Sequence, residues 1–158
     1  MGVFAASDIV EIAIRIEENG INFYKFAEKL AKQAEAKKLF AGLAAAEQSH
    51  KRTFEKLFAN LEKNSPAESY EGEYGAYLRS YVDNNIVFTK EVMEKELAKI
   101  KDTSAALDFA IRRELDSILY YHEVKKMVPA AQHQVIEKVI DEERTHFLDL
   151  TKIKQSLK

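Results

Sequence analysis

The chain has 158 residues, of which 46% are hydrophobic and 32% are charged, the balance of one ordered domain with a sizeable core. The net charge of −2 comes from interspersed charges, which excludes the basic footprint of a protein that binds nucleic acid or an anionic membrane. Cysteine is absent, which excludes disulfides, thiol catalysis and iron held by thiolates of this chain. Five Gly and two Pro leave little punctuation, so long helices are favoured over many short strands.

The N-terminal stretch Met1–Ile16 is partly apolar, but no basic residue lies near its start. Asp8, Glu11 and Arg15 interrupt its apolar residues. It therefore has the pattern of neither a signal peptide nor a membrane span. We expect a cytoplasmic protein without a membrane partner.

Apolar residues at helical spacing predict four long helices. The second ends at Asn64-Ser65-Pro66 because proline cannot continue a helix, and Pro129 separates the third from the fourth. Asp102-Thr103-Ser104 offers an N-cap for the third helix. The predicted helices cover residues 7–33, 35–63, 104–128 and 130–156.

The stretch between the second and third helices is long enough to cross the length of a bundle. Within it we expect a loop to about Gly72 and shorter helices near Tyr74–Asp83 and Thr89–Ile100. The prediction is one all-α domain over residues 1–158, a four-helix bundle. Its parts are a helical hairpin over 7–63, a crossover over 64–103 and a second hairpin over 104–156.

Two Glu-x-x-His strings stand out, Glu47-Gln48-Ser49-His50 and Glu143-Arg144-Thr145-His146. On a helix this spacing puts a carboxylate and an imidazole one turn apart on one face. In both copies, the residues seven positions away on either side are apolar. The lines are Phe40, Glu47, Phe54, Leu61; Leu43, His50, Leu57; Ile136, Glu143, Leu150, Leu157; and Val139, His146, Ile153. All four ionisable side chains are therefore expected to face the core.

The two halves of the chain resemble each other. The segment that ends in Glu17 recurs as the segment that ends in Glu114, and Tyr24 and Tyr121 each follow their glutamate by seven residues. The Glu-x-x-His strings repeat at an offset of 96 residues. Glu18 lies on a wholly charged line, so Glu17 is the glutamate expected to face inward. Each half is a hairpin with one inward Glu on its first helix and Glu-x-x-His on its second, which indicates a pseudo-twofold repeat.

The four inward carboxylates would each cost several kcal/mol if they were ionised and unpaired in a core. No Lys or Arg lies on the inward lines, and Arg113 falls at the edge of its face. Two divalent cations would balance the carboxylates and use both imidazoles as ligands. Oxygen-rich ligation with one nitrogen per metal suits iron or manganese, and zinc also occupies such sites. The alternative is a structural bundle whose core polar groups are satisfied without metal.

This arrangement resembles the ferritin-like diiron-carboxylate proteins. The Glu-x6-Tyr and Glu-x-x-His hairpin, used twice over nearly the whole chain, resembles the rubrerythrin family within them. The resemblance implies a ferritin-like four-helix bundle, with the long crossover between helices two and three, around two iron ions. It implies Glu47 and Glu143 as bridging ligands, Glu17 and Glu114 as terminal ligands, His50 and His146 as one nitrogen ligand per metal, and Tyr24 and Tyr121 as hydrogen-bond donors to the ligands.

The resemblance also implies an oxidoreductase of peroxidase type that reduces hydrogen peroxide or dioxygen. Rubrerythrins carry a second iron centre on four cysteines, which this chain lacks, so electrons would come from a separate donor protein. Peroxidases of the family carry an extra Glu one turn from the third-helix ligand. In this chain Ile111 and Ser117 occupy those positions, and neither is acidic. Their presence weakens the peroxidase prediction, and the alternative is an iron-binding, storage or metal-sensing protein without turnover. We also expect a homodimer.

Overall fold

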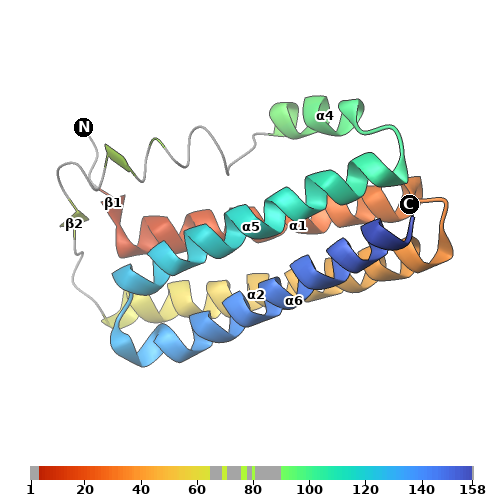
Figure 1. Ribbon diagram of the computed structural model, residues 1–158. Coiled ribbons are helices and arrows are strands. Elements are labelled where there is room, and N and C mark those ends of the chain that lie inside the picture. Colours follow the sequence, from red (N-terminus) through yellow and green to blue (C-terminus); the bar gives the residue numbers. More distant parts are fainter. Residues whose placement is uncertain (1–3, 65–68, 71–75, 78–79, 81–89, 158) are drawn as a thin grey trace.

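The computed structural model describes residues 4–64, 69–70, 76–77, 80 and 90–157 and shows a bundle of four long helices (Figure 1). Its long helices are α1 (Ala6–Leu30), α2 (Ala34–Asn64), α5 (Thr103–Met127) and α6 (His133–Ser156). The shorter elements are α4 (Lys90–Lys99), the 3-10 turn η1 (Ala130–Gln132), β1 (Phe4–Ala5) and β2 (Ser69–Tyr70). The predicted all-α bundle is confirmed.

Helix direction explains the long crossover. α1 and α2 are antiparallel, as are α5 and α6, whereas α2 and α5 run the same way (Figure 1). The chain must therefore return along the whole bundle between Asn64 and Thr103. The helix expected near Thr89–Ile100 is α4, and Leu97 within it and Ile100 just after its end pack on the bundle. Most of the helix expected near Tyr74–Asp83 lies outside the described residues.

Local chemistry accounts for where α5 and α6 begin. α5 begins after Asp102, whose carboxylate accepts a hydrogen bond from the backbone N–H of Ala105 at 2.8 Å, the capping predicted from sequence. After Pro129 the chain forms η1 before α6, so the fourth α-helix begins three residues later than predicted. The two-residue strands β1 and β2 pair antiparallel, which the sequence did not predict.

The core is divided into two apolar clusters, one toward each end of the bundle. The first includes Ile16, Phe54 and Ile136, and the second includes Phe23, Phe40 and Leu107. On every long helix, a stretch of six to nine residues separates the residues of the two clusters. All the buried glutamates and histidines predicted from sequence fall in those stretches. A polar layer therefore crosses the middle of the bundle between two apolar ones.

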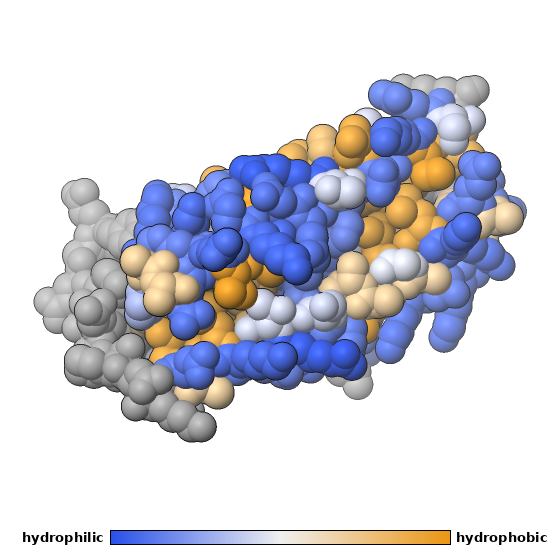
Figure 2. All heavy atoms as spheres, turned by 90° about the horizontal axis from the view of Figure 1, so that it is seen from below, coloured by the Kyte–Doolittle hydropathy of each residue, from blue (hydrophilic) through white to orange (hydrophobic). Residues whose placement is uncertain are grey.

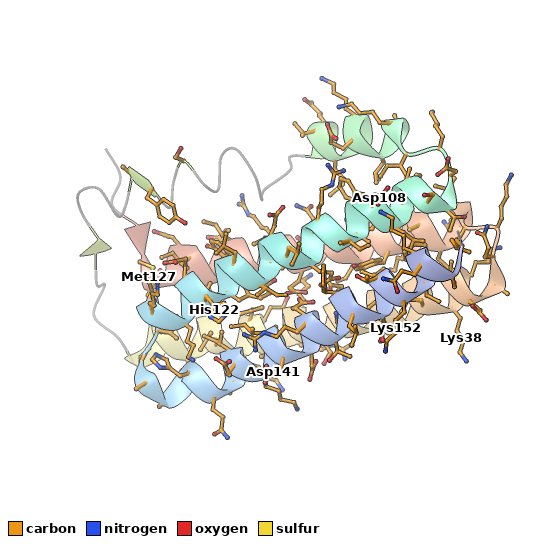
Figure 3. The ribbon with its side chains drawn as sticks, in the orientation of Figure 1. Lys38, Asp108, His122, Met127, Asp141 and Lys152 are labelled. Carbon is orange, nitrogen blue, oxygen red and sulfur yellow. The ribbon has the colours of Figure 1, made fainter. Side chains whose placement is uncertain are left out.

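Charged residues such as Lys38, Asp141 and Lys152 lie on the outside of the bundle (Figure 3). Seen from the side of α2 and α6, hydrophobic residues form separate patches between charged ones (Figure 2). Within the described residues, no helix is both long and apolar enough to span a membrane.

Candidate metal centre

All six residues that the sequence singled out as ligands meet in the polar layer. The four glutamates and His50 are at most 3% exposed, and the side chain of His146 is 12% exposed. Their ligand atoms form two overlapping groups, in each of which the atoms lie within 4.8 Å of one another. The groups are Glu17, Glu47, His50 and Glu143; and Glu47, Glu114, Glu143 and His146. Glu47 and Glu143 belong to both groups, so the geometry is that of two adjacent cation positions with two shared carboxylates.

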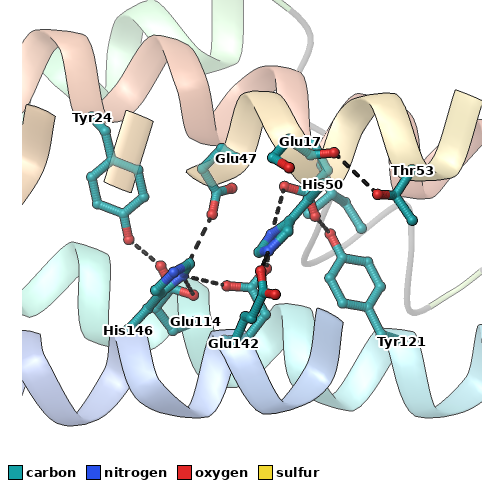
Figure 4. A network of polar contacts seen from close by, with 12 residues as sticks. Glu17, Tyr24, Glu47, His50, Thr53, Glu114, Tyr121, Glu142 and His146 are labelled. Atoms are coloured by element: carbon teal, nitrogen blue, oxygen red, sulfur yellow. Dashed lines mark hydrogen bonds and ion pairs between the residues drawn. The ribbon is translucent and has the colours of Figure 1, made fainter. Parts of the chain in front are cut away.

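Both imidazoles turn Nδ1 toward Glu143, and Figure 4 shows both rings among the buried carboxylates. Nδ1 of His50 lies 3.2 Å from Oε1 of Glu143 and 3.6 Å from Oε2 of Glu17. Nδ1 of His146 lies 2.9 Å from Oε2 of Glu143 and 3.8 Å from Oε2 of Glu114. The ring centroids are 5.6 Å apart. Glu143 therefore contacts both imidazoles, one with each carboxylate oxygen.

Two tyrosines hold the outer glutamates by hydrogen bonds between the hairpins. The hydroxyl of Tyr24 donates to Glu114, and the hydroxyl of Tyr121 donates to Oε1 of Glu17 (Figure 4). Burial, followed by the charges of nearby glutamates, raises the pKa of both tyrosines well above its usual value. The phenols therefore stay protonated and keep donating. Tyr24 and Tyr121 thus contact the two glutamates that the sequence proposed as terminal ligands, and the role of these contacts toward a metal stays a prediction.

Burial and mutual repulsion govern the carboxylates. Desolvation, followed by the charges of neighbouring glutamates, raises the pKa of Glu47 and Glu114 well above its ordinary value. Desolvation also raises the pKa of Glu17. For Glu143 burial acts in the same direction, but its contacts with His146, His50 and Glu114 outweigh it and lower the pKa. Burial lowers the pKa of His50, yet Glu143 and Glu17 overcome it and raise that pKa to about 11.

Arg113 contributes more than its position at the edge of a helix face predicted. Its guanidinium donates from Nη2 to the backbone oxygen of Ile16 at 3.1 Å, and its charge opposes the rise in the pKa of Glu47 and Glu114. A Cβ added to Gly20 would overlap the Glu47 carboxylate and come within 3.0 Å of Arg113 Nη2. Gly20 therefore leaves the space in which Glu47 approaches α1, a requirement that the helical pattern did not reveal.

Glu142 was also missed as a site residue. Glu143 is buried, as its place on an apolar line predicted, whereas the side chain of Glu142 is 44% exposed. Its Oε2 nevertheless lies 2.7 Å from Nε2 of the buried His50 (Figure 4). No periodicity signals this contact, because Glu142 on α6 reaches across to α2.

A surface groove of about 600 Å³ lies between α2 and α6 and reaches the cluster at His146. Its walls include Leu39, Leu43 and Ile153, with Thr145 beside His146. A Cβ added to Gly42 in this groove would meet nothing within 4 Å. His146 is thus the residue through which the buried cluster borders the surface.

The cluster leaves several buried polar atoms without hydrogen-bond partners. Within the described residues these atoms include Oε2 of Glu17, Oε1 of Glu47, Nδ1 of His50 and Oε1 of Glu143. All four atoms belong to the same group of candidate ligands, that of Glu17, Glu47, His50 and Glu143. Orphaned buried acceptors are costly, and a cation between them would satisfy them together. The donor set, carboxylate oxygens with one imidazole per position, fits a pair of divalent metals.

A four-helix bundle with a long crossover and this buried Glu/His layer defines the class of ferritin-like carboxylate metal proteins. The chain superposes with a TM-score of 0.78 on a Thermotoga maritima protein whose crystal structure was solved at 2.30 Å resolution. That protein is a proposed ferritin-like diiron-carboxylate protein. The two share 28% sequence identity over 100% of this chain and 99% of that one. The fold is therefore ferritin-like.

The rubrerythrin family model matches residues 8–154, which include all six candidate ligands and both tyrosines. The chain belongs to the rubrerythrin family. No curated protein matches it at a significant level.

The pKa shifts predict that the metal-free protein loses stability as pH rises from about 5 to 9. Glu47 and Glu114 bind protons more tightly in the fold than unfolded, so their contribution is lost as pH rises above their ordinary pKa of 4.5. The contribution of His50 is present below 6.5 and is lost as pH rises toward its folded pKa of about 11. Glu143, whose pKa is lowered, adds no slope above 4.5.

Thermal unfolding followed by circular dichroism at several pH values, with a chelator present, measures this slope. Glu47→Gln should flatten it, because the amide has no proton to lose. A melting temperature that rises with pH over this range would contradict the raised pKa values of Glu47, Glu114 and His50.

Proposed function

We propose that the protein is a non-haem diiron oxidoreductase that reduces hydrogen peroxide or dioxygen with electrons from an external donor. The observation that carries the proposal is the pair of overlapping ligand groups that share Glu47 and Glu143. Metal pairs that share ligands at such close range suit two-electron chemistry, because both ions contact one small substrate. Membership of the rubrerythrin family supports the same class.

In this proposal each residue has one role toward the metals. Glu47 and Glu143, which belong to both groups, would hold both metals, Glu17 and Glu114 would each hold one, and His50 and His146 would each supply Nδ1. Two ferrous ions in these positions would supply the two electrons that, with two protons, convert one hydrogen peroxide into two waters. Manganese and zinc are the other metals that this donor set accepts.

The protein itself positions and shields the ligands. Tyr24 and Tyr121 hold one oxygen of each terminal carboxylate and leave the other to the cluster. Apolar side chains close the bundle on both sides of the polar layer. The groove at His146 is the route by which a small oxidant reaches the site in this proposal.

The proposal includes a separate electron-donor protein, since the chain has no cysteine for a second iron centre. It also includes a cytoplasmic homodimer. Leu115 and Leu119, one turn apart on α5 and 48% and 49% exposed, offer apolar surface that a second copy would cover.

The alternative is an iron-binding, storage or metal-sensing protein without turnover. One observation favours it: the positions one turn from Glu114 are Ile111 and Ser117, and Ser117 is buried without offering a carboxylate. A fifth glutamate that exchanges with a histidine during turnover is therefore missing from those positions. Kinetics separate the two functions.

The first test is metal content. Protein expressed with ample iron should contain two metal ions per chain by elemental analysis. Glu143→Ala should lose both, because Glu143 belongs to both ligand groups, whereas Glu17→Ala should retain one. Glu18→Ala is the matched control, since this neighbouring glutamate is exposed and pairs with Lys51. A metal-free wild-type protein, or a Glu143→Ala protein with two ions, would contradict the centre.

The second test is reactivity. Anaerobic stopped-flow mixing of the reduced, iron-loaded protein should show faster oxidation by hydrogen peroxide than by dioxygen. A reduced donor should then restore the ferrous state repeatedly. If peroxide is no faster than dioxygen and no donor restores the ferrous state, the storage or sensing alternative replaces the peroxidase.

The third test concerns access. Gly42→Trp should slow oxidation by peroxide several-fold, because the indole would fill the groove beside His146, while the metal content stays at two ions. Gly42→Ala is the matched control and should oxidise at the wild-type rate, since its methyl group meets open space. Equal rates in all three proteins would show that the oxidant enters elsewhere.

A further inference from the structure

The two halves of the metal centre match in their carboxylates and tyrosines but differ at their histidines. Nε2 of His50 lies 2.7 Å from Oε2 of Glu142. The 96-residue offset that relates the two Glu-x-x-His strings relates Glu142 to Ala46, which has no acceptor for His146. The part of the chain that the structure describes places no carboxylate against Nε2 of His146 either.

The contact has a direct consequence for the ring of His50. A carboxylate only accepts hydrogen bonds, so Nε2 of His50 carries a proton and donates a hydrogen bond to Oε2 of Glu142. The metal-binding lone pair is then on Nδ1, which faces Glu143 at 3.2 Å and Glu17 at 3.6 Å. A carboxylate partner of this kind fixes the orientation and tautomer of a ligand histidine and raises its basicity.

His146 lacks this support and is the more exposed of the two. Its side chain is 12% exposed against 2% for His50, and it borders the groove between α2 and α6. Its ring is oriented through Nδ1, within the cluster itself, by the contact with Glu143 at 2.9 Å. A ring held at both nitrogens loses less freedom on binding a metal than a ring held at one.

We propose that Glu142 is a positioning residue for His50 and makes the metal position at Glu17 and His50 the tighter of the two. The inference rests on the metal centre of the proposed function and concerns its internal asymmetry. It assigns a role to a half-exposed residue that is not a ligand. The competing explanation is a surface ion-pair contact with no influence on the metals, which exposed charges often make.

The experiment is a titration of the metal-free protein with Co²⁺, followed by calorimetry and by the visible absorption of the bound ion. The wild-type protein should bind two Co²⁺ ions in distinguishable steps. Glu142→Ala should weaken the tighter step by roughly 10–100-fold, the usual effect of losing a hydrogen-bond partner of a ligand histidine, and leave the weaker step unchanged. The absorption of the first Co²⁺ should change with it.

Two further variants separate positioning from charge. Glu142→Gln keeps an oxygen that accepts from Nε2, so it should lose less affinity than Glu142→Ala. Asp141→Ala is the matched control, because it removes the adjacent negative charge, which pairs with Arg144 and does not contact His50. An equal loss in Asp141→Ala would replace the positioning role with a general charge effect.

A double-mutant cycle assigns the effect to one histidine. In a His50→Ala background, Glu142→Ala should cause no further loss of Co²⁺ affinity. In a His146→Ala background, it should still cause its full loss. The inference is overturned if Glu142→Ala has no effect on the wild type, or if its effect persists without His50.

Failure of the inference is distinguishable from failure of the proposed function. A correctly folded wild-type protein that takes up fewer than two Co²⁺ ions contradicts the dinuclear centre, and the inference falls with it. Two bound ions in the wild type, with an indistinguishable titration for Glu142→Ala, contradict only the role of Glu142. Circular dichroism melting of each variant excludes a loss that comes from unfolding.

Discussion

The burial of four glutamates midway along the bundle is the constraint on which the rest of the structure depends. Desolvation is the largest influence on the pKa of Glu17, Glu47 and Glu114, and the neighbouring carboxylate charges add to it for all three. Ionised and unpaired, these groups would be too costly to keep in a core. Every other feature of the polar layer lowers that cost, through tyrosine donors, imidazoles, one guanidinium and the sites for two cations.

The apolar clusters on either side make that layer possible. Because they pack independently toward the two ends of the bundle, the fold is held by contacts that do not involve the ionisable residues. The ligands can therefore be arranged for a metal pair rather than for the strongest packing. Natural proteins commonly accept such local costs at functional sites and offset them elsewhere.

The pseudo-twofold repeat provides two nearly equivalent metal positions, and its exceptions make them different. Tyr24 with Glu114 and Tyr121 with Glu17 obey the symmetry. Arg113 contacts the backbone of the related residue Ile16 and acts on Glu47, with no equivalent beside Glu143 among the described residues. Gly20 allows the close approach of Glu47, while the related residue is Ser117. The repeat thus explains the number of candidate ligands, and single residues that differ between the two halves explain how the two sides differ.

The sequence by itself determined the four helices, the long crossover and the six inward candidate ligands, because helical periodicity and a duplicated motif are local properties that survive in any correct packing. It separated Glu17 from Glu18 and placed Glu143 on an inward line for the same reason. Only the tertiary structure decided that Glu142 reaches His50, that Arg113 approaches Glu47, that Gly20 makes room for a carboxylate and that His146 borders a groove. Those contacts join different helices, and their distances depend on how the helices cross, which no spacing along one helix encodes.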